Sequence, residues 1–371
     1  MEGKSTNRIA WIDIFKAICI ILVVVGHSTG KFNHYIYQFH MAAFFFISGY
    51  TSKIWKKDAE GLIINKAKTV LLPTITMIFG LAAIRAVKAV VLSELTLANG
   101  IKYIFNTLQS YLVSGSADSM LGAIWFLSVL FFVFIIQRII WRSTEKRGPV
   151  LYMVVTVAVY LLGYHLQKIG YRQIHGFDIA LIAQVYFAMG VVVSKFELFD
   201  KLRGRKWRGA IYVLAGVYMF LMTKIGQTTV DYPSRSYPSV LMAVIAPLGG
   251  ILLVFGISEL TEYLGKAAIS VLGRLGRDSM GIIFLHFIGF KVATALLMPF
   301  KITVFDDLKS FLLPQSVATY GWAWIYYTVI SILFSVAVWE ILTHIPVLRF
   351  CLTGKSKKNQ KNNGKEVTQN V

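Results

Sequence analysis

A cation and an imidazole frame the first long apolar run of the chain. The stretch FKAICIILVVVGHSTG has Lys16 near its start and His27 eleven positions later, with only apolar or small residues between them. In an α-helix eleven residues turn by about 1,100°, so both side chains fall within roughly 20° on one face, about 16.5 Å apart along the axis. Such a face would offer a positive charge at one end and, three turns away, a base whose ordinary pKa of about 6.5 suits proton transfer. Asp13 lies one turn before Lys16 and can pair with it.

Each of these residues also has a simpler interpretation. Lys16 can be a flanking residue whose amine reaches the lipid headgroups. His27, near a helix end, can be an interfacial histidine, and Asp13 can be a helix-start residue favoured by the helix dipole. The functional interpretation gains weight because titratable groups inside a membrane are costly and mark functional sites by default.

Two more histidines lie in apolar segments. His40 occurs in QFHMAAFFFISGY and His286 in GRDSMGIIFLH. His40 follows His27 across a short connection, so we expect the pair to meet in the same half of the membrane, and we expect His286 at mid-membrane depth. Ser48 and Gly49 are typical of a point where two helices approach closely.

The elements that must position these residues are membrane-spanning helices. The chain has 371 residues, of which 56% are hydrophobic and 15% charged, and its mean hydropathy is +0.63. A window of about twenty residues predicts an all-α, polytopic protein with about ten transmembrane helices. They are expected at 11–30, 35–52, 70–91, 120–141, 149–166, 178–195, 208–224, 238–258, 279–298 and 323–345. The connector 92–119 can hold an extra short helix.

The formal net charge of +20 follows from topology. Most Lys and Arg residues fall in one alternating set of loops, together with the N-terminus and the C-terminal tail. Because basic loops are cytoplasmic, both termini are predicted in the cytoplasm and no nucleic-acid partner is needed. We divide the chain into a transmembrane domain, 1–350, and a basic tail, 351–371, whose composition predicts disorder. Cys19 and Cys351 suggest neither a disulfide framework nor a metal site.

These residues resemble the membrane acyltransferase 3 family, in particular its polysaccharide O-acetyltransferase and fucose 4-O-acetylase-like branch. The family's first helix carries a basic residue, ten intervening residues and a histidine, as Lys16 and His27 do here. FHMAAFFFISGY matches its second helix, with Ala42 where proline is usual, and GAIWFLSVLF around Trp125 and GRDSMGIIFLH match two later elements. The matches run from about residue 8 to 345. Many members carry arginine where this chain has Lys16, Lys66 and Lys68, and lysine lacks the bidentate fork of arginine.

The resemblance implies transfer of an acetyl group from acetyl-CoA to a sugar or polysaccharide hydroxyl, in a bacterial plasma membrane. It implies no cofactor beyond acetyl-CoA, which is the donor substrate. Catalytic roles would fall to His27, His40 and His286. Donor binding would fall to Lys16, Asp13, Lys66, Lys68 and Arg277. Trp125, Ser48 and Gly49 would form the wall of the site. The sequence alone also allows a transporter or flippase of a lipid-linked sugar and, on weaker grounds, a non-catalytic membrane sensor.

Overall fold

The computed structural model describes residues 10–56, 59–91, 93–115, 119–171, 174–226, 229–310 and 312–354. Within these ranges the chain is helical without β-strands, apart from an isolated bridge between Asp231 and Ser236. The predicted all-α class is therefore confirmed. The longer helices are α1 (Ala10–Ser28), α2 (Asn33–Ser52), α4 (Leu72–Val91), α5 (Leu97–Ser114), α6 (Trp125–Thr144), α7 (Pro149–Lys168), α8 (Phe177–Lys195), α10 (Arg208–Ile225), α11 (Met242–Thr261), α12 (Lys266–Arg277), α13 (Ser279–Leu297) and α15 (Ala323–His344). The shorter ones are α3 (Ala59–Lys66), α9 (Leu198–Arg203), α14 (Gln315–Ala318) and α16 (Pro346–Thr353).

Nine helical stretches of the described chain are long and apolar enough to cross a membrane. They are Ala10–Ser28, Gly61–Val91, Met120–Arg147, Pro149–Lys168, Phe177–Lys195, Arg208–Ile225, Met242–Thr261, Ser279–Phe300 and Ala323–His344. The remaining predicted segment, 35–52, forms α2, which has the length of a span. It carries Gln38 and His40 on a helix that is buried among its neighbours. The polytopic architecture is thus confirmed, and the predicted cytoplasmic placement of both ends stays a prediction.

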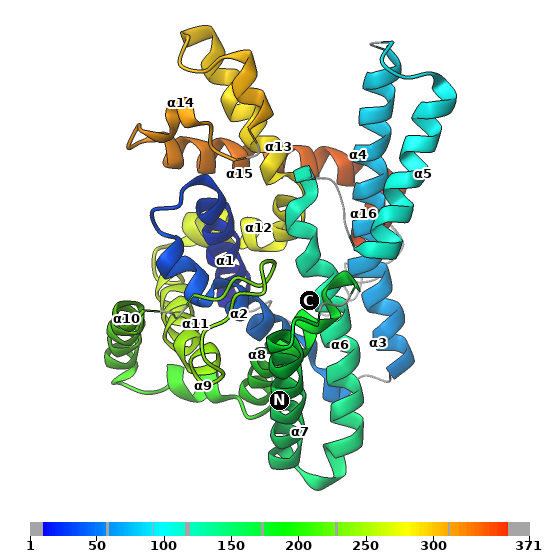
Figure 1. The fold of residues 1–371 in the computed structure, drawn as a ribbon. Coiled ribbons are helices and arrows are strands. Elements are labelled where there is room, and N and C mark those ends of the chain that lie inside the picture. Colours follow the sequence, from blue (N-terminus) through cyan, green and yellow to red (C-terminus); the bar gives the residue numbers. More distant parts are fainter. Residues whose placement is uncertain are drawn as a thin grey trace, which may run out of the picture.

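Helix α1 lies in the middle of the bundle, where it contacts α2, α11, α12, α13 and α15 (Figure 1). The end of the bundle at which α1 begins is here called the first end. It holds the start of α10 and the end of α11, because Glu259 contacts Arg208 and Glu262 contacts Trp11. The opposite end is here called the second end. It holds the starts of α2, α6 and α8 and the loops that follow α10 and α13. The α4–α5 hairpin stands to one side of this arrangement.

Helices α2 and α8 pack at backbone distance because each has a glycine at the crossing. A Cβ atom on Gly49 would lie 2.0 Å from the carbonyl oxygen of Phe187, and a Cβ on Gly190 would lie 2.0 Å from that of Phe46. Small residues at a helix crossing let the backbones approach and gain van der Waals contact, which drives association in lipid. This contact holds α2, and His40 with it, in a fixed position.

An ion-pair network fixes the first end. Glu259 of α11, 1% exposed, lies 2.9 Å from Nε of Arg208 and accepts a 2.5 Å hydrogen bond from the Tyr212 hydroxyl. Glu262 pairs with Arg203 at 2.5 Å, and its other oxygen accepts the backbone N–H of Trp11 at 3.0 Å. The start of α1 is therefore tied to α9 and α11.

Five helices lie outside the ten predicted segments and the connector: α3, α9, α12, α14 and α16. The amphipathic α12 packs against α1 so closely that a Cβ on Gly276 would lie 1.8 Å from the carbonyl oxygen of Asp13. Helix α16 continues to Thr353, beyond the proposed start of the tail at 351, and residues 355–371 lie outside the described residues.

Candidate active site

Histidines from the first and the ninth predicted spans form a direct contact. Nδ1 of His27, near the end of α1, lies 3.0 Å from Nε2 of His286 on α13. Their rings are nearly parallel, at 8°, with centroids 5.2 Å apart. The contact joins residues 259 positions apart in the sequence, so packing of α13 against α1 creates it.

Backbone carbonyls determine which nitrogen of each ring carries a proton. Nδ1 of His286 lies 2.8 Å from the carbonyl oxygen of Ile282 and 3.1 Å from that of Ile283. A carbonyl only accepts hydrogen bonds, so Nδ1 of His286 is the protonated nitrogen, and in a neutral ring Nε2 is an acceptor. His27 must then donate from Nδ1, which leaves Nε2 of a neutral His27 with a free lone pair. A histidine oriented in this way is equipped to act as a general base.

Helix α15 supports this pair from behind. The Ser331 hydroxyl donates to the backbone carbonyl of His286 at 2.7 Å. Ser28, next to His27, lies 3.0 Å from Thr328 through their hydroxyl oxygens. Both α15 residues are buried. These two hydrogen bonds, one to the backbone of His286 and one to the neighbour of His27, fix α1 and α13 relative to α15.

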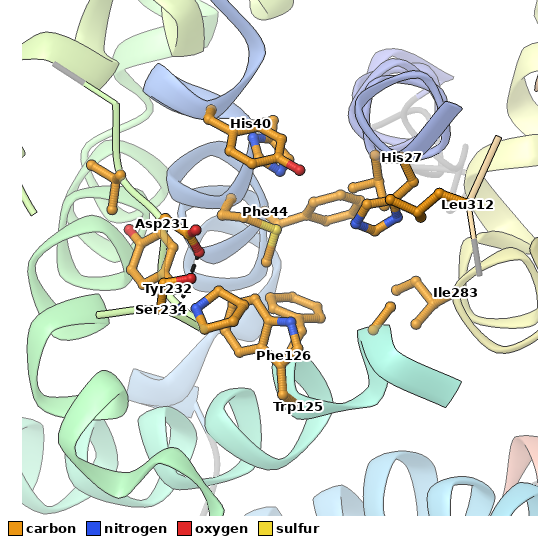
Figure 2. A pocket seen from close by; sticks show the side chains of 16 residues that line it. His27, His40, Phe44, Trp125, Phe126, Asp231, Tyr232, Ser234, Ile283 and Leu312 are labelled. Atoms are coloured by element: carbon orange, nitrogen blue, oxygen red, sulfur yellow. Dashed lines mark hydrogen bonds between the residues drawn. The ribbon is translucent and has the colours of Figure 1, made fainter. Parts of the chain in front are cut away.

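A cavity of about 460 Å³ lies beside His27, within the roughly 300–1,000 Å³ typical of small-molecule sites. It lies toward the second end, where α1 finishes. Figure 2 shows His27 and Leu312 on one side and Asp231 and Tyr232 on the other. The full lining comprises Val23, His27, Tyr37, His40, Met41, Phe44, Ala123, Trp125, Phe126, Val230, Asp231, Tyr232, Pro233, Ser234, Ile283 and Leu312.

His40 belongs to the same cavity. Its Nδ1 lies 2.7 Å from the carbonyl oxygen of Ile36, one turn earlier in α2. By the argument used for His286, Nδ1 is protonated and Nε2 of a neutral ring is an acceptor. His27 and His40 therefore bring two acceptor nitrogens to one cavity.

Aromatic rings and one short loop complete the wall. Trp125, the first residue of α6, stacks on Tyr232 with ring centroids 6.0 Å apart and 23° between the planes. Tyr232 lies in the loop between α10 and α11 and is 2% exposed. Burial raises the pKa of the Tyr232 hydroxyl well above its ordinary value, so the phenol stays neutral at physiological pH. The wall is thus mainly apolar, with few polar groups.

The cations proposed for donor binding do not line this cavity. Lys16 is half-buried on α1. The amine of Lys66 lies over the ring of Phe134, 3.6 Å from its centroid. Lys68 is exposed, and its carbonyl oxygen lies close to Gly354, the residue that follows α16. Lys16 lies on the second turn of α1, whereas Lys66 contacts a residue halfway along α6.

Two further donor candidates join α1 to α12. The Arg277 guanidinium lies 3.7 Å from the carboxylate of Asp13, which is buried. Arg277 therefore contributes to the packing of α12 at the first end. The sequence pattern paired Asp13 with Lys16 and gave no indication of its contact with Arg277, because α12 was not expected.

The proposed wall residues divide into two groups. Trp125 lines the cavity, whereas Gly49 lies at the crossing of α2 and α8 and Ser48 is half-buried beside it. Sequence reasoning missed Tyr37 and Asp231 as cavity residues. Asp231 lies in TTVDYPSRSYPS, where the Asp-Tyr-Pro-Ser run is a turn signal that marks a structured loop. The hydroxyl residues of α15 at 328, 331 and 335 repeat at helical spacing, a pattern typical of a polar face turned toward a partner helix.

The chain as a whole matches one protein family. The family model described as an acyltransferase domain, that of the acyltransferase 3 family, aligns with residues 9–342, from the start of α1 to near the end of α15. No curated protein and no solved structure matches the chain. The aligned segment holds His27, His40, His286 and all the other residues of the cavity. The chain therefore belongs to the acyltransferase 3 family of membrane acyltransferases.

Proposed function

We propose that the protein transfers an acetyl group from cytoplasmic acetyl-CoA to a hydroxyl group of a cell-surface or lipid-linked sugar, in the plasma membrane of a bacterium. Family membership supports acyl transfer at a membrane and does not favour a transporter. The observation that carries the proposal is the oriented His27–His286 pair beside a cavity.

The proposed reaction begins with Nε2 of His27. This nitrogen takes the proton of the acceptor hydroxyl as the oxygen attacks the thioester carbonyl. The carbon–sulfur bond breaks, the acceptor becomes an acetyl ester, and the imidazolium of His27 returns its proton to the leaving CoA thiolate. Atoms and charge balance without a further reactant.

His286 stabilises the charged form of His27 during this step. The imidazolium keeps its Nδ1–H, which donates to Nε2 of His286 at 3.0 Å. The carbonyls of Ile282 and Ile283 prevent His286 from turning its protonated nitrogen toward His27. His286 is therefore a positioning residue, as the orienting carboxylate is in a Ser-His-Asp triad. His40 contributes a second acceptor nitrogen, which can orient a hydroxyl.

Donor and acceptor would approach from opposite ends of the bundle. Lys16 lies near the start of α1, and it would bind the nucleotide phosphates of the donor together with Lys66 and Lys68. The cavity lies toward the second end. The rise from Lys16 to His27 is about 16.5 Å, a distance that an extended pantetheine arm can span.

The test is acetyl-CoA turnover by the purified protein in lipid nanodiscs with methyl glycosides as acceptors, followed as release of the CoA thiol. Wild-type protein should turn over acetyl-CoA, and His27→Ala should lower the rate by about 10²–10⁴-fold, the usual contribution of a general base. His34→Ala is the matched control, because His34 is exposed and its Nε2 contacts only the carbonyl of Thr223 among the described residues. Absence of turnover by the wild type, or equal rates for His27→Ala and His34→Ala, would overturn the proposal.

A further inference from the structure

The loop between α10 and α11 forms the cavity wall that faces His27. Its described part begins at residue 229, and Val230, Asp231, Tyr232, Pro233 and Ser234 all line the cavity. Most of a loop with so many polar residues would ordinarily face solvent. Here it faces the site, so its polar groups are candidates for contact with substrate.

The loop is held rigidly from both sides. Asp231 and Ser236 exchange two backbone hydrogen bonds of 2.9 Å, which close a tight turn. Arg235 in this turn grips Asp178 at the start of α8, with Nε 2.7 Å from Oδ2 and Nη2 3.2 Å from Oδ1. The backbone N–H of Val230 donates to the carbonyl of Tyr37 on α2 at 3.1 Å. The loop is therefore clamped to α8 and to α2.

The carboxylate of this clamp is buried and held by two guanidinium nitrogens. Asp178 is 0% exposed, and the Arg235 side chain is 19% exposed. A bidentate arginine–carboxylate pair has fixed geometry as well as strength. Arg235 also has a positive φ of 56°, which is uncommon for a residue with a side chain. The backbone thus adopts a rare conformation where the clamp forms.

The clamp presents the carboxylate of Asp231 to the cavity. Oδ1 of Asp231 accepts the backbone N–H of Ser234 at 3.2 Å. Oδ2 has no hydrogen bond within the described part of the chain. An ionised carboxylate only accepts hydrogen bonds, so Asp231 selects for a donor group. Asp231 and His27 lie on opposite sides of the cavity (Figure 2).

We propose that Asp231 is a positioning residue that binds a second hydroxyl of the acceptor while His27 acts on the first. The neighbouring rings of Trp125 and Tyr232 offer an apolar surface for the C–H face of a sugar ring, and Asp231 binds at its edge. The site therefore selects acceptors with at least two hydroxyl groups on one ring. This inference rests on the proposed acetyl transfer, of which it specifies the acceptor geometry.

The test uses purified protein in nanodiscs with acetyl-CoA and methyl glycosides of glucose, galactose, mannose and fucose. The best of these acceptors is then compared with its mono-deoxy analogues. Asp231→Ala should lower kcat/KM for the sugar by roughly 10- to 100-fold, the range for loss of a hydrogen bond to a charged group. Asp231→Asn should lose less, because its amide oxygen still accepts. The KM for acetyl-CoA should stay within about twofold of the wild type.

The deoxy analogues identify the hydroxyl concerned. For one analogue the wild type should lose activity by the same factor as Asp231→Ala, and the variant should lose nothing more, because partners in one contact are not additive. Asp306→Asn is the matched control, since Asp306 is exposed and pairs with Lys309 away from the cavity.

Three results would overturn the inference. They are equal sugar kinetics for Asp231→Ala and Asp306→Asn, a loss that is the same on every deoxy analogue, and His27-dependent CoA release with no acetylation of any glycoside. The last result would leave the proposed use of acetyl-CoA standing. Absence of CoA release under all conditions would instead overturn the proposed function.

Discussion

Replacing His286 by phenylalanine tests whether His27 is oriented by its partner. Phenylalanine has a similar shape and suits the surroundings of His286, whose ring lies 4.0 Å from that of Phe287 and 6.0 Å from that of Phe290. It offers no acceptor, so the Nδ1–H of His27 would lose its partner at 3.0 Å. The perturbation therefore removes the hydrogen bond to His27, together with those from Nδ1 of His286 to the carbonyls of Ile282 and Ile283, and replaces the ring by one of similar shape.

The size of the effect on the rate follows from the lost bond to His27. Leaving a buried donor without a partner costs about 1–3 kcal/mol, and each 1.36 kcal/mol changes a rate tenfold. The expected loss in kcat is about 5- to 150-fold. It should appear in kcat, because the charge on His27 develops only during the reaction. The KM for acetyl-CoA should not change.

The assay is steady-state CoA release by purified variants in nanodiscs. His286→Gln is the informative companion, since its amide oxygen can accept near the position of Nε2 and should restore part of the lost rate. Thermal unfolding of each variant separates a catalytic loss from a folding defect, because His286 is fully buried. A His286→Phe variant that keeps more than half of the wild-type kcat would refute the reasoning. So would a His286→Gln variant that is folded but no faster than His286→Phe.

Three further predictions follow from packing and charge. Gly49→Leu should lower the melting temperature, because even its Cβ would lie 2.0 Å from a backbone oxygen and overpacking costs about 1–3 kcal/mol or more. Gly80→Leu is the control, since a Cβ there has nothing within 4 Å, and it should leave the melting temperature unchanged. Equal melting temperatures for the two variants would contradict this prediction. Arg235→Ala should reduce the free energy of unfolding by about 3–5 kcal/mol, because it leaves the buried carboxylate of Asp178 unpaired; a denaturation curve that coincides with the wild type would be the opposing result. Lys16→Ala should raise the KM for acetyl-CoA several-fold without altering the KM for the acceptor, and a change confined to the acceptor KM would remove Lys16 from the donor site.

The spans could be predicted from the sequence because each must be apolar for about twenty residues. Every one of the ten predicted segments corresponds to a helix. The amphipathic α12 was missed because its 12 residues are too few to span a membrane and one of its faces carries Lys266, Arg274 and Arg277. Its position is determined by its tertiary contact with α1, which a local sequence pattern cannot predict.

The histidines could be selected from the sequence, whereas their pairing could not. His27 and His286 stood out because titratable groups are rare in apolar helices. Which of His40 and His286 would contact His27 depends on the packing of α13 against α1 and α15, and thus on small residues such as Gly289 beside Ser331. The spacing of Lys16 and His27 predicts that they share a face of α1, but it says nothing of the other elements around that face. The cavity beside His27 is built by α2, α6 and two loops, and Lys16 does not line it.

Asp231 shows the remaining limit of sequence reasoning. A single aspartate between two spans has the character of an ordinary surface residue. Two contacts place it at the cavity: the backbone hydrogen bonds between Asp231 and Ser236, and the ion pair of Arg235 with Asp178. Long-range contacts of this kind are set by the fold as a whole.

The most direct measurement of the central claim is the mass of surface glycans from cells that express the wild type or His27→Ala at matched levels in the membrane. The account predicts that glycans from wild-type cells carry an additional acetyl group on a sugar hydroxyl and that glycans from His27→Ala cells lack it. An identical acetyl content in the two samples, with both proteins folded and present in equal amount, would contradict the account.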